Sequence, residues 1–409
     1  MAALTVPALL AHLPLGGGGA VVRDGDETIV AVDPVEVRVA SGEDAFALLR
    51  AAGESGFWAG FLAYDLGRTV ERVSDTAIDE LALPDVALAR YDTRLVLRPD
   101  SEPTVIGAGH TAELLAQAAW RGRRGDEPAF RAPPTAWESS LDRREHSAAV
   151  DAILELLAEG ECYQVNLTRR LRAPVASDPV RLFSALHHAN PAPHAALCAF
   201  GPDLPDVAVV SASPELFLRV DGRSVETRPI KGTGVDPDAL TRSAKDRAEN
   251  VMIVDLARND LGRVCEYGSI TVPALCALEA HPGLYHLVST VRGRLRPEIG
   301  FDALVRATFP PASITGAPKP RVLQAIERLE PVRRGVYCGA IGWIDGDAGR
   351  AELSVAIRTF TIARGATYFG VGGGIVADSR AASEWSETEL KAARLLAAAS
   401  GASAGADAR

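Results

Sequence analysis

The chain of 409 residues is poor in sulfur, with only five cysteines and two methionines. The cysteines are Cys162, Cys198, Cys265, Cys276 and Cys338. Their number is odd and no two have C-x-x-C spacing, so the sequence predicts neither a disulfide framework nor a zinc knuckle. Reduced thiols are the normal state in the cytoplasm, which is where we expect the protein to be.

An excess of positive charge is also missing. Lys and Arg number 43 against 53 Asp and Glu, which gives a formal net charge of −10 and argues against nucleic acid as a partner. No run of about 18 apolar residues occurs, so we expect no membrane span. The apolar N-terminus has no basic residues at its start and is interrupted by Pro7, His12 and Pro14, which argues against a signal peptide.

The composition is otherwise that of a globular protein, 47% hydrophobic and 23% charged. This length suits two domains or one large domain. Residues 121–135 are polar and rich in proline, which is typical of a surface connection. We therefore predict a domain boundary or a surface connection there, after an N-terminal region at 1–120.

One helix is predicted with particular clarity. Asp142 and Glu145 form a capping box, apolar residues recur after them at helical spacing, and Gly160 ends the segment. In 162–168 polar and apolar residues alternate, so Gln164, Asn166 and Thr168 share one face of a predicted strand. That polar face suits either a pocket wall or a solvent-facing sheet. Other strands are predicted at 20–23, 28–32, 57–64, 337–344, 352–359 and 367–376.

The segment 226–233 contains a lysine with unusual neighbours. Pro229 restricts the backbone before Lys231, and Gly232 permits a sharp turn after it. The pattern places Lys231 at the end of a strand, next to a turn. A lysine there is either a solvated loop residue or, if desolvated, an amine nucleophile.

The final predicted helix carries Glu384, Glu387 and Lys391 on one flank. With Glu249, they could supply three carboxylates, a set that suits Mg²⁺. The alternative is a solvated helix face. The preceding glycine cluster at 370–374 lacks the dinucleotide fingerprint, because residue 375 is Ile; its exposed amides remain suited to a smaller anion.

Many long segments in the stretch 140–398 together resemble the chorismate-utilising enzymes. This family includes anthranilate synthase, isochorismate and salicylate synthases, and aminodeoxychorismate synthase component I. Residues 1–110 resemble the family's N-terminal region more loosely. The matching segments are 163–167, 213–217, 228–233, 245–260, 286–289, 313–319, 356–359, 372–375 and 384–387.

Two positions discriminate within the family. Hydroxylating members have a lysine base where this chain has Gln164. A glutamine amide cannot deprotonate water, so the resemblance favours an amine nucleophile over water. Aminodeoxychorismate synthases carry Pro-Ile-Lys-Gly-Thr, as at 229–233, where anthranilate synthases typically have Ala in place of Lys231. The resemblance thus implies amination of chorismate at carbon 4; the alternative is anthranilate synthase, which aminates carbon 2 with loss of pyruvate.

The resemblance also implies roles for individual residues. Lys231 would be the covalent nucleophile and Glu215 the general acid for the departing hydroxyl. Mg²⁺ would be bound by Glu249, Glu384 and Glu387. The product, 4-amino-4-deoxychorismate, is a precursor of p-aminobenzoate and folate. Expected substrate-binding residues are Gln164, His286, Thr315, Tyr337, Arg358, Gly372, Gly373, Gly374 and Lys391.

The chain lacks a glutaminase nucleophile turn of its own. Cys338 lies between Gly335 and Gly339, but no His and acidic residue follow at recognisable spacing, which favours a buried structural thiol. Ammonia would therefore come from a separate glutamine amidotransferase subunit. The fold that the resemblance implies is α+β, with two large, mostly antiparallel sheets packed face to face and helices on the outside.

Overall fold

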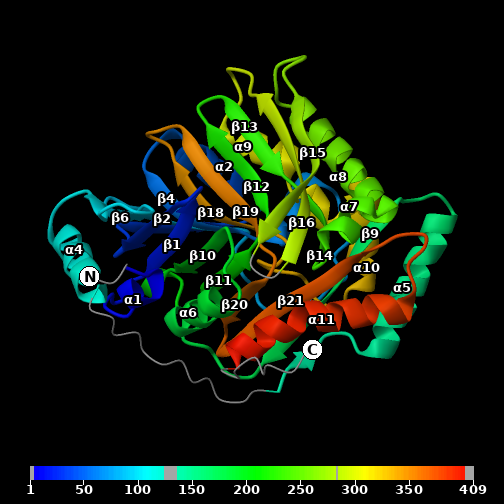
Figure 1. The fold of residues 1–409 in the computed structure, drawn as a ribbon, viewed down its shortest axis with the longest axis horizontal. Coiled ribbons are helices and arrows are strands. Elements are labelled where there is room, and N and C mark those ends of the chain that lie inside the picture. The colour runs from blue at the N-terminus through cyan, green and yellow to red at the C-terminus, as the bar shows by residue number, and fades with distance from the viewer. Residues whose placement is uncertain (1–3, 124–135, 282–283, 401–409) are drawn as a thin grey trace.

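A computed structural model describes residues 4–123, 136–281 and 284–400 of the chain. Two large β-sheets form the body of the molecule, and helices cover their outer faces (Figure 1). Every pairing between the described strands is antiparallel. Most of the connection predicted at 121–135 lies outside the described residues.

The first sheet contains eleven strands and includes the glycine cluster at one end. Its strands in spatial order are β17 (Gly316–Ala317), β9 (Gln164–Ala173), β21 (Ala366–Ile375), β20 (Thr359–Ala363), β11 (Ala208–Ser213), β10 (His194–Ala199), β1 (Gly19–Asp24), β2 (Glu27–Val32), β6 (Arg94–Leu97) and β7 (Thr104–Ile106), with β8 (Glu138–Ser139) also paired to β9.

The second sheet contains ten strands and includes Lys231. Its strands in spatial order are β14 (Ile230–Gly234), β16 (Leu284–Arg294), β13 (Ser224–Arg228), β12 (Leu216–Asp221), β19 (Arg350–Val355), β18 (Ala340–Asp345), β4 (Phe57–Leu62), β5 (Val86–Tyr91) and β3 (Glu36–Ala40), with β15 (Thr271–His281) also paired to β16.

An apolar core joins the inner faces of the two sheets. Phe61 of β4 meets Phe200, which follows β10, edge to face with ring centroids 5.6 Å apart. Val22 of β1 and Ile341 of β18 belong to the same buried cluster. Burial of apolar area between two facing sheets is the main stabilising contribution of such an interface. The predicted fold class is confirmed.

Helices cover the outer faces of both sheets. In Figure 1, α11 lies along β21 and α8 lies beside β15 and β16. The helices are α1 (Val6–Leu10), α2 (Glu43–Glu54), α3 (Gly67–Val70), α4 (His110–Gly122), α5 (Arg143–Ala158), α6 (Pro179–Ala189), α7 (Pro237–Arg242), α8 (Ala244–Gly262), α9 (Phe301–Thr308), α10 (Lys319–Leu329) and α11 (Ala381–Ala399), with single 3-10 turns η1 (Tyr64–Leu66), η2 (Gly201–Asp203) and η3 (Ala312–Ile314).

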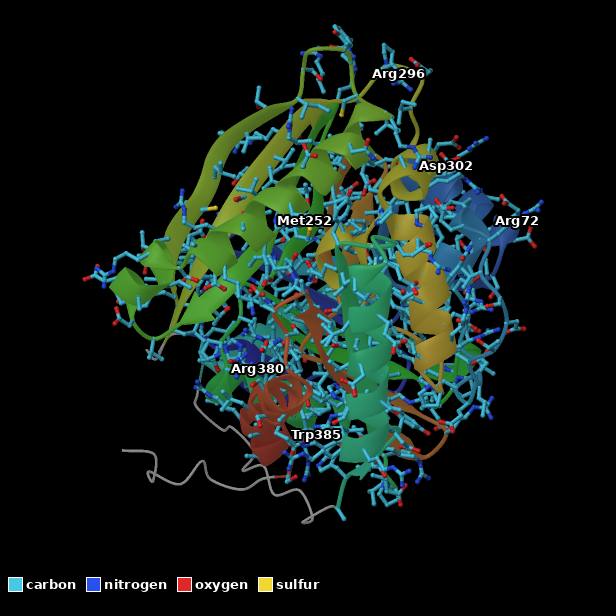
Figure 2. The ribbon with its side chains drawn as sticks, turned by 90° about the vertical axis from the view of Figure 1, so that its right-hand side faces the viewer. Arg72, Met252, Arg296, Asp302, Arg380 and Trp385 are labelled. Carbon is cyan, nitrogen blue, oxygen red and sulfur yellow. The ribbon has the colours of Figure 1, made fainter. Side chains whose placement is uncertain are left out.

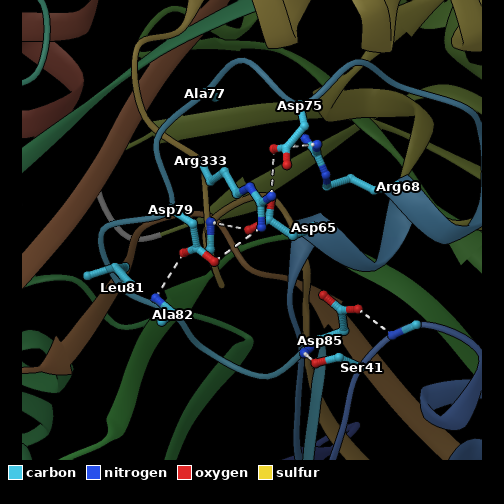
Figure 3. Close-up of polar contacts among 12 residues, drawn as sticks. Ser41, Asp65, Arg68, Asp75, Ala77, Asp79, Leu81, Ala82, Asp85 and Arg333 are labelled. Carbon is cyan, nitrogen blue, oxygen red and sulfur yellow. Dashed lines mark hydrogen bonds and ion pairs between the residues drawn. The ribbon is translucent and has the colours of Figure 1, made fainter.

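Residues 1–120 do not form sheets of their own. They contribute strands to both sheets, and β4 pairs with β18 from the C-terminal part. Ion pairs reinforce this connection, since Arg333 contacts Asp75 at 2.8 Å and Asp79 at 3.1 Å (Figure 3). The division into 1–120 and 140–398 stays a prediction, with the added finding that both parts share each sheet.

Local predictions agree with the structure where the signal was local. The capping box is present, because Asp142 accepts from the Glu145 N–H and Glu145 accepts from the Asp142 N–H. Two strand predictions need correction. Tyr337 precedes β18 in a turn, and the segment 352–359 is broken between β19 and β20. Both breaks coincide with residues in the left-handed region, Cys338 at φ 66° and Arg358 at φ 51°.

The described residues include no helix that is both long enough and apolar enough to cross a membrane.

Candidate active site

Lys231 lies on a bulge in a short strand. It is the second residue of β14, not the terminal residue that the sequence predicted. The register with β16 shifts between Ile230 and Thr233, and Gly232 has φ 88°. A Cβ on Gly232 would approach the Asp246 Cβ of α8 to 3.0 Å, so this close approach favours glycine. The bulge directs the lysine out of the regular ladder.

The Lys231 amine has no hydrogen-bond or ion-pair partner among the described residues. Burial lowers its pKa, while the nearby carboxylates of Glu249 and Glu215 oppose this effect. Burial has the larger effect, so the pKa is lowered from its usual value. An amine in this state is a better nucleophile near neutral pH than an ordinary lysine.

Glu215 follows the end of β11 and is almost fully buried, at 4% exposure. Burial raises the pKa of its carboxyl to about 7. Ser313, the Lys231 amine and the Arg358 guanidinium favour the ionised form, but less strongly. A carboxyl with this pKa carries a proton in a large fraction of molecules at neutral pH, as a general acid requires.

Arg358 stands at the break between β19 and β20. Its guanidinium forms no hydrogen bond or ion pair within the part of the chain that the structure describes. Burial lowers its pKa, and Glu215 opposes that shift. A partly buried guanidinium with unused donors is suited to bind a carboxylate through two hydrogen bonds.

His286 of β16 lies in the same region. Its Nδ1 is 2.7 Å from the Thr233 hydroxyl, and its ring is 4.9 Å from that of His281. Burial, with the nearby Arg358 charge, lowers the pKa of His286 to about 4. The ring is therefore neutral at physiological pH and can only orient a ligand through hydrogen bonds or packing.

The position of α11 is fixed by Trp385. Its ring meets the His146 ring of α5 edge to face at 5.4 Å, and the Arg169 guanidinium of β9 lies 4.2 Å from its centroid. Figure 2 shows Trp385 at the end of α11 that lies beside α5. The tryptophan thereby holds the neighbouring Glu384 and Glu387 against the first sheet.

Glu384, Glu387 and Lys391 converge on Gly373. A Cβ on this glycine would lie 3.4 Å from Glu384 Oε2 and 3.8 Å from both Glu387 Oε1 and Lys391 Nζ. Glu384 accepts a hydrogen bond from the Ser379 hydroxyl at 2.6 Å. Lys391 donates to the Gly372 carbonyl at 3.1 Å. The missing side chain at residue 373 leaves room for these groups beside the β21 backbone.

The three predicted metal carboxylates have the right donor chemistry but separate partners. Glu387 pairs with Lys391 at 2.6 Å, and Glu249 of α8 has Lys245 at 3.9 Å. Burial raises the pKa of Glu249. At Glu387 burial has the same tendency, but Lys391 together with the charges of Lys245 and Lys231 outweighs it and lowers the pKa. The described residues contain no group of three His, Cys, Asp or Glu arranged to hold one metal ion.

Hard carboxylate oxygens and the room at Gly373 fit Mg²⁺, provided the two lysines give up their contacts. Lys391, which was expected to bind substrate, also pairs with an expected metal ligand, Glu387.

Gln164, the first residue of β9, lies beside the glycine cluster of β21. It is 1% exposed, and its Nε2 would be only 2.0 Å from a Cβ on Gly374. Its Oε1 has no hydrogen-bond partner among the described residues. Asn166 and Thr168 on the same strand face are also buried. Of the two alternatives for this polar face, the buried wall is therefore the one observed.

Two residues that were expected to bind substrate, Thr315 and Tyr337, have their contacts away from Lys231 and Glu215. The Thr315 hydroxyl donates to the carbonyls of Pro311 and Ala312 in its own turn. The Tyr337 ring packs on Gly370, where a Cβ would lie 2.2 Å from ring atoms. Within the described residues, neither hydroxyl forms a hydrogen bond with Lys231 or Glu215.

Two residues beside the site had no role assigned from sequence. Ser313 is buried beside Glu215, and its hydroxyl favours the ionised carboxyl. Asn250 is buried on α8 next to Glu249. An asparagine in a helix interior was the available signal for the second, because Asn is a weak helix former there.

Known proteins provide an independent test of the resemblance. The sequence profile described as chorismate binding enzyme matches residues 24–397. The chain belongs to this family. The match runs through both predicted regions and includes Glu215, Lys231 and the carboxylates of α8 and α11.

Curated members of the chorismate-binding family match most of the chain. Aminodeoxychorismate synthase component 1 of Salmonella typhimurium is 41% identical, over 82% of this chain and 75% of its own length. The Bacillus subtilis protein of the same name is 35% identical, over 81% and 74%. An anthranilate synthase component 1 of Haloarcula marismortui is 38% identical, over 82% and 74%.

A solved structure of the same family has a similar fold. Anthranilate synthase component I from Streptococcus pneumoniae superposes with a TM-score of 0.78 at 27% identity, covering 91% of this chain and 92% of that one. The menaquinone-specific isochorismate synthase of Escherichia coli, at 19% identity and a TM-score of 0.76, covers 97% of this chain and 92% of its own and shares the fold.

Proposed function

We propose that this chorismate-binding enzyme aminates chorismate at carbon 4 to give 4-amino-4-deoxychorismate, the reaction of aminodeoxychorismate synthase component 1. The observation that carries the proposal is the Lys231 amine, which is partly buried, unpaired among the described residues and close enough to Glu215 for each to shift the pKa of the other. The curated relatives named for this activity support it.

The two groups have complementary protonation near neutral pH. Burial lowers the pKa of Lys231, which favours the free amine, and raises that of Glu215 to about 7, which favours the acid. The amine attacks carbon 2 of chorismate while the ring double bonds shift and the carbon 4 hydroxyl departs. Glu215 protonates that hydroxyl, so it leaves as water.

Ammonia completes the reaction. It adds at carbon 4, the double bonds shift back, and the bond between Lys231 and carbon 2 breaks. The net change replaces the hydroxyl of chorismate by an amino group, with one water released. Gln164 offers only an amide at the position where hydroxylating relatives have a base, so water is not activated there.

The remaining residues bind and orient the substrate. Arg358 has free donors for a carboxylate, and neutral His286 lies beside it. Glu249, Glu384 and Glu387 would hold Mg²⁺, and the last two lie beside Gly373. When bound, the ion would neutralise these carboxylates together with the ring carboxylate of the substrate.

The supply of ammonia points to a second protein. Cys338 is fully buried, and burial raises the pKa of its thiol to about 11, so it is unsuited to attack glutamine. A component 1 by name has a partner component. We propose that this partner is a glutamine amidotransferase, and that the isolated chain uses ammonium but not glutamine.

The direct test is incubation of the chain with chorismate, Mg²⁺ and ammonium at raised pH, where free ammonia exists, with the products identified by mass and by chromatography against standards. We expect 4-amino-4-deoxychorismate. Anthranilate, which is fluorescent, would instead assign amination at carbon 2, and glutamine-dependent turnover by the chain alone would contradict the need for a partner.

A further inference from the structure

One buried amide connects the bulge that carries Lys231 to the helix behind it. Asn250 on α8 is 1% exposed. Its Nδ2 donates to the Leu287 carbonyl at 3.0 Å and, over a longer 3.5 Å, to the Lys231 carbonyl. A single side chain from α8 therefore contacts the backbone of both β14 and β16.

The bulge explains why an amide is needed there. Strands β14 and β16 are in register at Ile230 with Val288 and again at Thr233 with His286, but not between. The carbonyls of Lys231 and Leu287 belong to this interrupted part of the ladder. A buried carbonyl without a donor costs free energy. The two N–H groups of Asn250 supply the donors that the interrupted ladder lacks.

Ser289 fixes the orientation of that amide. This serine of β16 is fully buried, and its hydroxyl donates to Asn250 Oδ1. The same hydroxyl accepts from the Cys276 N–H of β15 at 2.8 Å. The Ser289 N–H donates to the Pro229 carbonyl at 3.1 Å, immediately before β14. With Oδ1 occupied by Ser289, Nδ2 is directed at the carbonyls of Lys231 and Leu287.

We propose that Asn250, oriented by Ser289, is a positioning residue for the Lys231 nucleophile. This inference rests on the proposed role of Lys231. The amide holds the backbone of Lys231 at a fixed place relative to α8, and α8 also carries Glu249. Loss of the amide leaves the lysine present but less precisely placed. A misplacement of about 1 Å can reduce a rate by about 100-fold.

The expected effect is on turnover more than on substrate binding. Among the described residues, the side chains of Arg358 and His286 form no hydrogen bond with Asn250, and His286 keeps its own contact with Thr233, so we expect the groups that bind chorismate to stay in place. We predict that Asn250→Leu, which keeps the volume but has no donors, lowers kcat by about 10- to 100-fold and changes KM for chorismate by less than about threefold. Ser289→Ala should also lower kcat, but by a smaller factor.

Ser211→Ala is the matched control. Ser211 is 1% exposed and its hydroxyl is 2.8 Å from the Thr359 hydroxyl, so it also joins two strands, but in the first sheet. Hydrogen exchange, followed by mass spectrometry of peptides, provides a second measurement that does not depend on turnover. Exchange in 228–234 should increase in both test variants and stay at the wild-type level in the control.

The outcomes separate the two proposals. Product identity in the wild-type chain decides the proposed function, whereas the variants decide the role of Asn250. If Asn250→Leu does not fold, Ser289→Ala carries the test, because it removes one hydroxyl only. Wild-type kcat and unchanged exchange in 228–234 for a folded variant would overturn the inference. So would equal losses in the Ser211→Ala control.

Discussion

Two groups of buried charges in this molecule differ in how completely they are paired. Arg334 and Glu330 form a pair with side chains only 2% and 4% exposed. The guanidinium donates twice to the carboxylate, at 2.9 and 2.7 Å, and also to the carbonyls of Ile314 and Asn166. Thr168 donates to Glu330 as well. The surrounding charge raises the pKa of Arg334 further, despite its burial.

The charges around Lys231 lack such pairing. Glu215 is as deeply buried as Glu330, but no guanidinium or ammonium lies within ion-pair distance of it among the described residues. Burial therefore dominates and moves the pKa values of Glu215 and Lys231 toward each other. Complete pairing makes a buried charge structural, and incomplete pairing leaves it reactive. Substitutions in the two groups should accordingly affect different properties.

The largest expected effect is on activity at Lys231. Lys231→Ala removes the nucleophile and leaves Glu215 and the carboxylates of α11 in place. Formation of the carbon 4 product should fall by several orders of magnitude, and residual amination should shift to carbon 2. Lys231→Arg should not restore activity, since a guanidinium stays protonated. Mass spectrometry and product assignment check this, with circular dichroism as a control for folding. A folded Lys231→Ala that keeps near wild-type carbon 4 amination would exclude a covalent lysine.

Removal of Mg²⁺ should be nearly as severe. The carboxylates of Glu249, Glu384 and Glu387 have only separate partners, so they remain available to a cation. EDTA should abolish turnover, and added Mg²⁺ should restore it. Glu387→Gln should raise the Mg²⁺ concentration needed for half-maximal rate without lowering thermal stability, because its side chain is half exposed. Full activity in the presence of EDTA would contradict a role for Mg²⁺.

Glu215→Gln should lower kcat by about 10²- to 10⁴-fold, the usual loss for a general acid. The same substitution should increase the stability of the protein rather than decrease it. The folded pKa of about 7 lies above the ordinary value of 4.5, so the folded state binds the proton more tightly and loses stability as pH rises through this window. The substitution should therefore stabilise the protein at pH 8, by up to about 3 kcal/mol, and change little at pH 4. Denaturant unfolding at both pH values checks the sign; a destabilised variant at pH 8 would show that Glu215 is paired after all.

The fully paired group should respond in the reverse way. Glu330→Gln leaves Arg334 buried without its counter-ion, which typically costs about 3–5 kcal/mol. Unfolding by urea should reveal this loss, whereas kcat per folded molecule should fall far less than in Glu215→Gln. Equal losses of activity in the two variants would contradict the distinction between the fully paired and the incompletely paired charges.

The smallest effect should come from an exposed pair. Glu43 contacts Arg306, but its side chain is 73% exposed. Solvent screens such a pair, so Glu43→Gln should leave both melting temperature and kcat within error of wild type. A clear loss in either would mean that exposure is a poor guide to the value of a charge in this fold.

The sequence was informative wherever the cause was local. The capping box of α5 depends on two residues only three positions apart, and it is found. The break at Arg358 was missed because its backbone angle depends on strands that meet there from distant parts of the chain. The same holds for Asn250, whose partners Lys231 and Leu287 lie 19 and 37 positions away. Motifs named the candidate site residues, and the spacing of Glu387 and Lys391 on one helix allows their pairing to be predicted. Only tertiary contacts show that both approach Gly373 of β21.

The shared sheets have a consequence for the timing of biosynthesis. Strand β4 pairs on one side with β5 and on the other with β18, which is made much later during translation. The second sheet therefore cannot close until β18 has left the ribosome, and one edge of β4 lacks its hydrogen-bonded neighbour until then. Contacts so distant in sequence slow folding and expose strand edges to other chains. We expect newly made chains to depend on holding chaperones until residues 340–345 emerge.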